Sequence, residues 1–208
     1  MITGTGRAGT TFLVELLTQL GLDTGFRADS IAQLKNQHGR AGLEHDLRKP
    51  NCPYIVKSPW FCNHADQIVR REDLSIEHIF VPIRDLNAAA QSRRYVTSTG
   101  WAKLSWRARI KQFIRRESLQ GGLWFTQSRR SGSQEDVLLG QFYKLMLAIS
   151  GSSVPVTLIR YPKLTQDSLY LFAKLSPILQ GINFESFEEA FKAVCRPDLV
   201  HQFNDNDR

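Results

Sequence analysis

The fold is decided by the stretch Ile2-Thr3-Gly4-Thr5-Gly6-Arg7-Ala8-Gly9-Thr10-Thr11, which runs directly into Phe12-Leu13-Val14-Glu15-Leu16-Leu17. A short apolar segment leads into a glycine-rich turn, and the turn opens an amphipathic helix. Glycines let the backbone curl with its N–H groups pointing inward, and the N-terminus of a helix adds partial positive charge. Arg7 contributes a full charge, while Thr10 and Thr11 contribute hydroxyl groups. The stretch therefore predicts a cradle for a phosphate group.

The spacing of the glycines narrows the kind of phosphate ligand. From Gly4 the stretch fits G-x-x-x-x-G-K-[ST], but Thr10 stands where a nucleotide hydrolase or kinase needs its lysine. The basic residue of the loop is instead Arg7, before the last glycine. No clear aspartate for magnesium follows an apolar strand, and Asp85 is the nearest candidate. The displaced basic residue therefore disfavours an ATP-dependent kinase.

Composition limits the class of protein. A chain of 208 residues with 42% apolar and 23% charged residues predicts a single globular domain over 1–208 with a substantial core. No apolar run approaches the roughly 20 residues that span a bilayer, and no export leader is visible. Because the first strand begins almost at residue 1, native sequence can precede it. The cysteines Cys52, Cys62 and Cys195 suggest neither a disulfide framework nor a zinc site, so we expect a cytoplasmic protein.

The charge balance favours anionic partners. The chain has 27 basic and 20 acidic residues, a net charge of +7, which suits phosphorylated cofactors, acidic glycans, lipid head groups or nucleic acid, or simply a basic surface. Much of the excess lies in a tryptophan-bearing segment at about 96–133. This segment is either a flap that closes on a cofactor or an anionic acceptor, or a solvated helix whose arginines lie along apolar surface.

Hydrophobic periodicity predicts strands that alternate with helices. Such alternation indicates a parallel sheet covered on both faces, a three-layer α/β/α fold like that of P-loop nucleotide hydrolases. After the short strand at Ile2, the expected strands are 53–56, 76–83 and 154–159. The expected helices are 11–20, 29–37, 63–70, 86–95, 105–119, 134–149, 164–179 in one or two pieces, and 184–194, with a polar tail over 204–208.

Polar residues follow several of the expected strands. They are the loop 4–11, the pair Lys57-Ser58, the segment 84–92 and the pair Arg160-Tyr161. In an open parallel sheet, ligands bind outside the carboxyl ends of the strands. We therefore expect the first three segments to converge on one site, whereas the last pair is expected to serve packing and hydrogen bonding.

These segments resemble those of sulfotransferases. The run Thr5-Gly6-Arg7-Ala8-Gly9-Thr10-Thr11 is similar to the 5′-phosphosulfate loop of that family, which has a basic residue two positions before G-T-T. Arg84, followed eight residues later by Ser92, resembles the family's 3′-phosphate motif, and 158–164 resembles its late R-Y-x-x-L segment. The likeness covers most of the chain, but the middle third matches little. The R-K-G-x-x-G motif of the family's cytosolic members is absent.

The resemblance implies binding of 3′-phosphoadenosine 5′-phosphosulfate (PAPS) and transfer of its sulfuryl group to a hydroxyl or amine on a small molecule or glycan. Two separated anionic groups need two basic pockets, and no metal is required because a sulfuryl group carries less charge than a phosphoryl group. Arg7 and Lys57 are the candidates that stabilise charge on the leaving phosphate. The expected ligands are Gly6, Arg7, Ala8, Gly9, Thr10 and Thr11 for the 5′ group, and Arg84 with Ser92 for the 3′-phosphate.

An acceptor hydroxyl or amine also needs a general base. Glu44 and His45 lie between the first helix and Lys57, where a substrate-facing loop is expected, so we favour Glu44 and then His45. His38 and His64 are further candidates, although His64 opens an expected helix, and capping that helix is its alternative role.

Other functions are compatible with the sequence. One alternative is a P-loop small-molecule kinase that uses ATP, and another is a relative that binds the nucleotide without catalysis. A nucleic-acid-binding protein that uses 103–130 ranks last because no nucleic-acid module is recognisable, so we expect no nucleic-acid partner. The sequence indicates neither the acceptor nor the oligomeric state.

Overall fold

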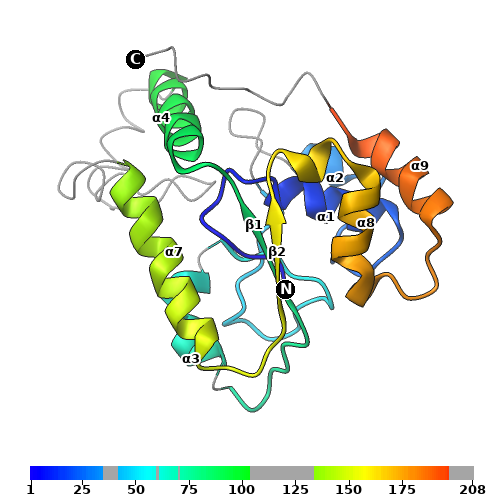
Figure 1. Cartoon of the computed structure of the whole chain (residues 1–208), viewed down its shortest axis with the longest axis horizontal. Helices are drawn as coiled ribbons and strands as arrows, with labels where there is room; N and C mark the ends of the chain where they lie inside the picture. Colours follow the sequence, from blue (N-terminus) through cyan, green and yellow to red (C-terminus); the bar gives the residue numbers. More distant parts are fainter. Residues whose placement is uncertain (35–41, 60, 70, 104–133, 197–208) are drawn as a thin grey trace.

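The computed structural model describes residues 1–34, 42–59, 61–69, 71–103 and 134–196 (Figure 1). Within these ranges, helices flank a small parallel sheet, so the chain is a mixed α/β protein. None of the described helices is both long and apolar enough to cross a membrane. The elements, in chain order, are α1 Thr10–Gln19, α2 Ile31–Leu34, the 3₁₀ helix η1 Phe61–Asn63, α3 Ala65–Val69, β1 Ile79–Ile83, α4 Leu86–Lys103, α7 Gln134–Ser150, β2 Val156–Arg160, η2 Lys163–Thr165, α8 Ser168–Leu175, η3 Ser176–Ile178 and α9 Phe184–Val194.

The sheet is built from parallel segments that are distant in the sequence. β1 pairs with β2 in a register that starts with Ile79 opposite Val156. Ile2 forms parallel bridges to both Phe80 and Lys57. The order across the sheet is therefore Lys57, Ile2, β1 and β2. Because all these segments run in the same direction, their carboxyl ends lie at the same edge.

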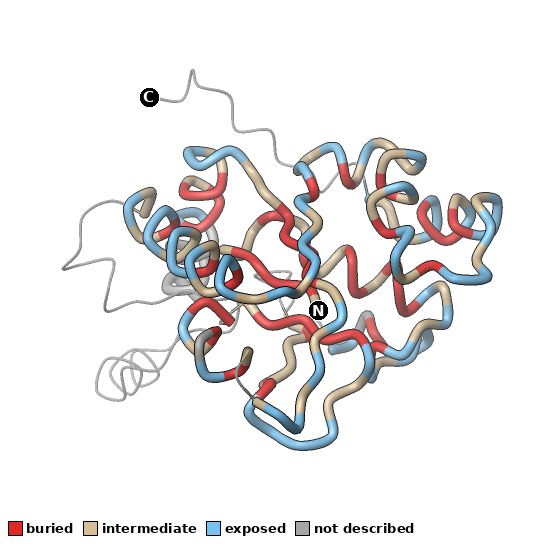
Figure 2. Tube along the Cα trace, turned by 60° about the horizontal axis from the view of Figure 1, so that its bottom comes forward, coloured by how far each residue is buried: buried red, intermediate tan, exposed pale blue. Residues whose placement is uncertain are grey.

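Two hydrophobic clusters lie on either side of these segments. One packs α1, α8 and α9 against Ile2, Phe80 and Ile159, and the other packs η1, α3 and α7 against Ile79 and Val81 (Figure 1). Successive residues of a strand point to opposite faces, so β1 contributes to both clusters. Figure 2 shows the buried residues along the middle of the molecule, between the exposed faces of the helices. Burial on both faces explains the continuous apolar sequence of β1.

Helix α1 fixes the position of the glycine-rich loop, defined as residues 4–11. The helix begins directly after Gly9, its N-cap residue, and the chain leaves it through Gly21, whose φ of 78° suits glycine. One face of the helix is completely buried, which holds the loop at the carboxyl edge of the sheet. The fully buried side chains of this face are Leu13, Val14, Leu16 and Leu17.

Each expected strand is shorter or shifted. The strand predicted over 53–56 is reduced to the bridge at Lys57. The reason is that Asp23 accepts the N–H groups of Tyr54 and Ile55, at 3.1 and 2.8 Å, which removes them from a ladder. The strand predicted over 154–159 is β2, which begins after Pro155 because proline has no N–H to donate. β1 begins at its first paired residue, three residues later than predicted.

The helix predictions for 11–20, 134–149 and 184–194 are confirmed to within one residue, whereas others are wrong in extent. α4 continues eight residues beyond its predicted end at 95. The region 63–70 divides into η1 and α3, and 164–179 divides into η2, α8 and η3 because Asp167 caps a new helix and Pro177 opens another turn. The predicted helix 29–37 is α2, with 35–37 outside the described residues. The helix 105–119, the part of the basic segment beyond residue 103 and the tail 204–208 also lie outside them.

Candidate functional site

The glycine-rich loop has the backbone of an anion cradle. Gly6, Arg7 and Gly9 adopt left-handed φ values of 76°, 60° and 89°. Within the described chain, the backbone N–H groups of Gly6, Ala8, Gly9 and Thr10 donate no hydrogen bond, and no side chain caps α1. Such N–H groups at the start of a helix favour an anion. A left-handed arginine is strained, which is common where function requires one backbone geometry.

Three of the predicted residues meet beside this loop. Arg7 donates from Nε to the Oγ of Ser92, at 3.1 Å, and Arg84 donates from Nη1 to the backbone carbonyl of Arg7, also at 3.1 Å. Ser92 is buried on α4, and Arg84 directly follows β1. The segment after β1 therefore lies in contact with the glycine-rich loop.

Lys57 contacts the loop from the segment beside Ile2. Its Nζ donates to Thr11 Oγ1 at 2.7 Å, to the Gly42 carbonyl at 2.6 Å and to Glu44 Oε1 at 3.1 Å. The residue is only 2% exposed. Burial lowers the pKa of the Lys57 ammonium, and the neighbouring Glu44 carboxylate opposes this effect. The three acceptors match the three N–H donors of a charged ammonium, so Lys57 is held firmly beside Thr11.

Glu44 and His45 are adjacent in the sequence but lie in different surroundings. Glu44 Oε1 accepts the Gly42 N–H at 3.1 Å in addition to the Lys57 ammonium. The His45 ring packs against Phe26, with ring centroids 5.0 Å apart, and its buried Nδ1 has no hydrogen-bond partner in the described chain. Burial lowers the His45 pKa, so its ring is neutral at pH 7. The structure therefore places the Glu44 carboxylate, and not the His45 ring, in hydrogen-bond contact with Lys57.

The segment that follows β2 packs under both halves of the site. The Arg84 guanidinium carbon lies 4.6 Å from the centre of the Tyr161 ring. A Cβ atom at Gly9 would lie 3.0 Å from Leu164 Cδ1 and 3.3 Å from Tyr161 Cδ2. Gly9 is therefore needed for this close approach as well as for its backbone angle.

Arg93 is a buried cation that the sequence reasoning missed. It is 3% exposed, lies next to Ser92 and donates to Gln141 Oε1 of α7 at 3.2 Å. Burial, together with the smaller effect of the charge on Arg7, lowers its pKa to about 10. In the sequence, only its place beside Ser92 distinguishes Arg93 from Arg94, whose side chain is 49% exposed and paired with Glu135.

His64, another candidate base, makes no described contact with Lys57. His64 precedes α3, and its backbone carbonyl accepts the N–H groups of Gln67 and Ile68, as expected of a residue that starts a helix. His38 lies outside the described residues.

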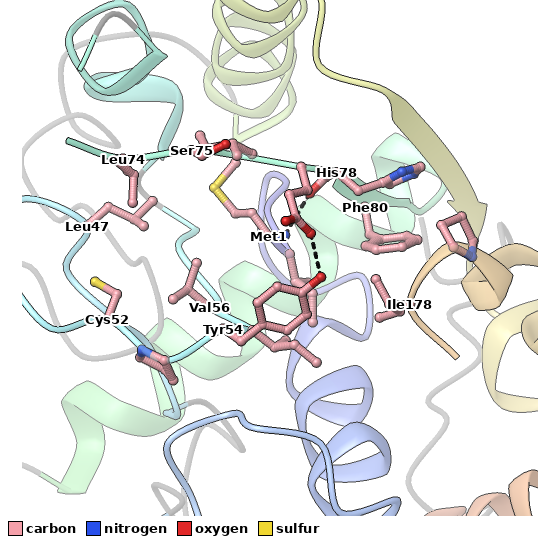
Figure 3. Close-up of a pocket in the computed structure, with 16 residues that line it drawn as sticks. Met1, Leu47, Cys52, Tyr54, Val56, Leu74, Ser75, His78, Phe80 and Ile178 are labelled. Carbon is pink, nitrogen blue, oxygen red and sulfur yellow. Dashed lines mark hydrogen bonds between the residues drawn. The ribbon is translucent and has the colours of Figure 1, made fainter. Parts of the chain in front are cut away.

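A cavity of about 350 Å³ lies at the opposite edge of the sheet from the glycine-rich loop (Figure 3). It is lined by Met1, Tyr54 and His78, which precede or begin the parallel segments, and by Ile178 of η3. The Tyr54 hydroxyl donates to the Glu77 carboxylate at its rim. None of the sequence-predicted site residues lines this cavity.

The contacts form two sets at the glycine-rich loop: Arg84 and Ser92 contact Arg7, and Lys57 contacts Thr11. This geometry is consistent with an anion-binding region around the loop. Among the described residues, no group of three or more His, Cys, Asp or Glu side chains could hold a metal ion. Comparison of the chain with protein-family models, with curated proteins and with solved structures found no match.

Proposed function

We propose that this chain is a sulfotransferase, which binds PAPS and transfers its sulfuryl group to a hydroxyl or amine acceptor. The proposal combines the resemblance of the loop, of the Arg84–Ser92 pair and of the late R-Y-x-x-L segment with the way these segments lie together.

One observation carries the proposal. The Arg84 guanidinium donates to the backbone carbonyl of Arg7, although the two residues are 77 positions apart in the sequence. PAPS has a 5′-phosphosulfate and a 3′-phosphate on one ribose, so its two anion pockets must be neighbours. The contact supports the proposal, because residues expected to bind the 5′ group and the 3′-phosphate are adjacent. Bidentate guanidinium donors also suit a phosphate.

We propose the three-layer α/β/α fold of P-loop nucleotide hydrolases for the whole domain. Its support is the parallel order Lys57, Ile2, β1, β2, together with the hydrophobic clusters on both sides. Helix α1, which follows the Ile2 segment after the glycine-rich loop, adds to this support. In such folds the nucleotide binds at the carboxyl edge of the sheet.

The proposed reaction is an in-line substitution at sulfur. The acceptor oxygen or nitrogen forms a bond to sulfur while the bond from sulfur to the bridging phosphate oxygen breaks, and adenosine 3′,5′-bisphosphate leaves. Negative charge develops on that bridging oxygen. Arg7, Lys57 and the loop N–H groups stabilise this charge. Position 10 is a threonine and carries no charge, so in this proposal Lys57 provides the cation from a neighbouring segment.

In this proposal, Glu44 takes the acceptor proton. Its Oε1 is anchored by Lys57 and by the Gly42 N–H, which hold the carboxylate in one orientation. His45 is the second candidate. Its neutral ring at pH 7 could accept a proton, but the ring packs against Phe26. The acceptor class and the expected cytoplasmic location stay predictions.

Thermal unfolding with added nucleotides tests the proposal. At about a hundredfold excess over its Kd, adenosine 3′,5′-bisphosphate without magnesium is expected to raise the melting temperature by about 5–10 °C. A rise that requires ATP with magnesium would favour the kinase alternative, and a steeply salt-dependent rise with generic DNA or RNA would favour nucleic-acid binding. No response to any 3′-phosphorylated nucleotide would contradict the proposal.

The role of Arg84 is tested by comparing two nucleotides. Arg84→Ala is expected to weaken the binding of adenosine 3′,5′-bisphosphate by about tenfold or more, because charge-assisted hydrogen bonds are lost. The binding of adenosine 5′-phosphate is expected to weaken far less. Arg94→Ala is the matched control, because Arg94 is exposed on α4 and paired with Glu135. Equal losses for both nucleotides would contradict the assignment of the 3′ pocket.

A further inference from the structure

Tyr161 connects the end of β2 to Arg84 and to the glycine-rich loop. Its backbone N–H donates to the carbonyl of Ile83 at 2.7 Å, so the residue is tied to the chain immediately before Arg84. Its ring centre lies 4.6 Å from the Arg84 guanidinium carbon. The edge of the same ring faces Gly9, where an added Cβ would lie 3.3 Å from Cδ2. A single aromatic ring thus contacts both the glycine-rich loop and the proposed 3′-phosphate arginine.

The surroundings of Arg84 give this contact a physical role. Arg84 is half-buried, and burial lowers the pKa of its guanidinium. A long arginine side chain has many rotamers. Without a flat surface on which to stack, the side chain would not be held in a single rotamer at a partly buried site. The face of an aromatic ring attracts a guanidinium and offers a flat surface on which it stacks.

We propose that Tyr161 is a positioning residue that holds the Arg84 guanidinium against the Arg7 carbonyl and so determines selectivity for 3′-phosphorylated nucleotides. The inference rests on the proposed function. Tyr161 does not need to touch the nucleotide in this role, because the ring acts through the orientation of Arg84. The 5′ group, which the loop holds, is then affected much less than the 3′-phosphate.

The ring and not the hydroxyl is expected to matter. Phenylalanine retains the aromatic face and the packing against Gly9, so Tyr161→Phe is the conservative control. Tyr161→Leu keeps an apolar side chain but removes the ring, and Tyr161→Met is a second ring-free variant of adaptable shape in case the leucine variant does not fold.

The experiment is calorimetric titration of each folded variant with adenosine 3′,5′-bisphosphate and with adenosine 5′-phosphate. Tyr161→Leu or Tyr161→Met is expected to weaken the binding of the 3′-phosphorylated nucleotide by about fivefold to tenfold. This is the effect expected from loss of a partly desolvated cation–π contact. The binding of adenosine 5′-phosphate is expected to weaken by less than about twofold. Tyr161→Phe is expected to bind both nucleotides with the affinity of the unaltered chain.

A double-mutant cycle with Arg84→Ala separates positioning from a general structural effect. If Tyr161 acts through Arg84, Tyr161→Leu causes no further loss of 3′-selectivity once Arg84 is absent. Equal weakening of both nucleotides, or a full additional loss in the Arg84→Ala background, would overturn the inference while leaving the proposed function intact. Failure of the unaltered chain to bind either nucleotide would overturn the proposed function, and this inference with it.

Discussion

Gly9 is the residue whose identity the structure constrains most clearly. It needs a left-handed backbone, which its φ of 89° shows, and it also needs to lack a side chain, because Leu164 and Tyr161 approach it closely. The first requirement is local and is implied by a glycine between a loop and a helix. The second depends on the segment 161–164, which comes 150 residues later, and no pattern in the sequence indicates it.

Gly9→Ala is predicted to destabilise the chain by about 2 kcal/mol or more, since it combines left-handed strain with a clash against Leu164. Gly21→Ala is the matched control: its φ of 78° imposes similar strain, but nothing lies within 4 Å of the added Cβ, so about 1 kcal/mol is expected. Urea unfolding measures both values. Equal losses would mean that the approach of Leu164 costs nothing.

The buried pair of Lys57 and Glu44 is the second feature at this scale. Lys57 was expected from its place at a strand end, and Glu44 from its place in a loop, but nothing in the sequence indicated that they bond to each other and, through Lys57, to Thr11. The side chains are 3% and 12% exposed, so the charge on each one stabilises the other in surroundings with little water.

Glu44→Gln is predicted to reduce the free energy of unfolding by about 2 kcal/mol, because it leaves the buried Lys57 ammonium without its counter-charge. Asp46→Asn is the control, since Asp46 pairs with the exposed Arg48 and little change is expected. Chemical unfolding at pH 7 gives the comparison. A Glu44→Gln chain as stable as the control would contradict the structural role of the pair.

At the scale of elements, local signals account for most of the helices. α1, α7 and α9 follow from apolar periodicity, and α9 has its start marked by Asn183, whose side chain accepts the Ser186 N–H at 2.9 Å. Strand extents are predicted less well, because a strand exists only where a partner segment lies. The amides of Tyr54 and Ile55 bond to Asp23 in place of a neighbouring strand, and apolar sequence alone does not reveal that competition.

Asn183→Ala is predicted to destabilise the chain by about 1 kcal/mol, because the first turn of α9 loses its cap. Phe187 of the same helix is completely buried, so fraying of α9 would loosen its packing on α1 and α8. Ser186→Ala is the control, since only the backbone of Ser186 takes part in the cap. If thermal unfolding shows no difference between the two variants, the cap does not stabilise the helix.

At the scale of the whole molecule, acid sensitivity is expected from the half-buried His45. Burial lowers the pKa of His45 below its ordinary 6.5. As the pH falls through 6.5, the unfolded chain takes up a proton that the folded chain does not, so folding stability decreases until the pH reaches the folded pKa. His78, whose pKa burial also lowers, adds an effect of the same sign.

His45→Phe removes this titration while retaining the contact with Phe26. The free energy of unfolding of the variant is predicted to depend less steeply on pH below 6.5 than that of the unaltered chain. Urea unfolding at a series of pH values between 5 and 8, with His64→Gln as the control, measures the slope. Parallel curves for His45→Phe and the unaltered chain would show that His45 titrates alike in both states.

The sequence by itself determined the features that depend on neighbouring residues: the glycine-rich turn, the helix that follows it, the apolar segment of β1, and the spacing of eight positions between the strand-end Arg84 and Ser92. Glycine tolerance of positive φ and the periodicity of apolar side chains act over a few residues, so they can be read from the chain directly. Only the tertiary structure decided that Arg84 bonds to Arg7, that Lys57 lies between Thr11 and Glu44, that Arg93 is buried and that Tyr161 lies under Arg84. These contacts join segments far apart in the chain, and they arise because burial of two hydrophobic clusters brings the carboxyl ends of the parallel segments to one edge.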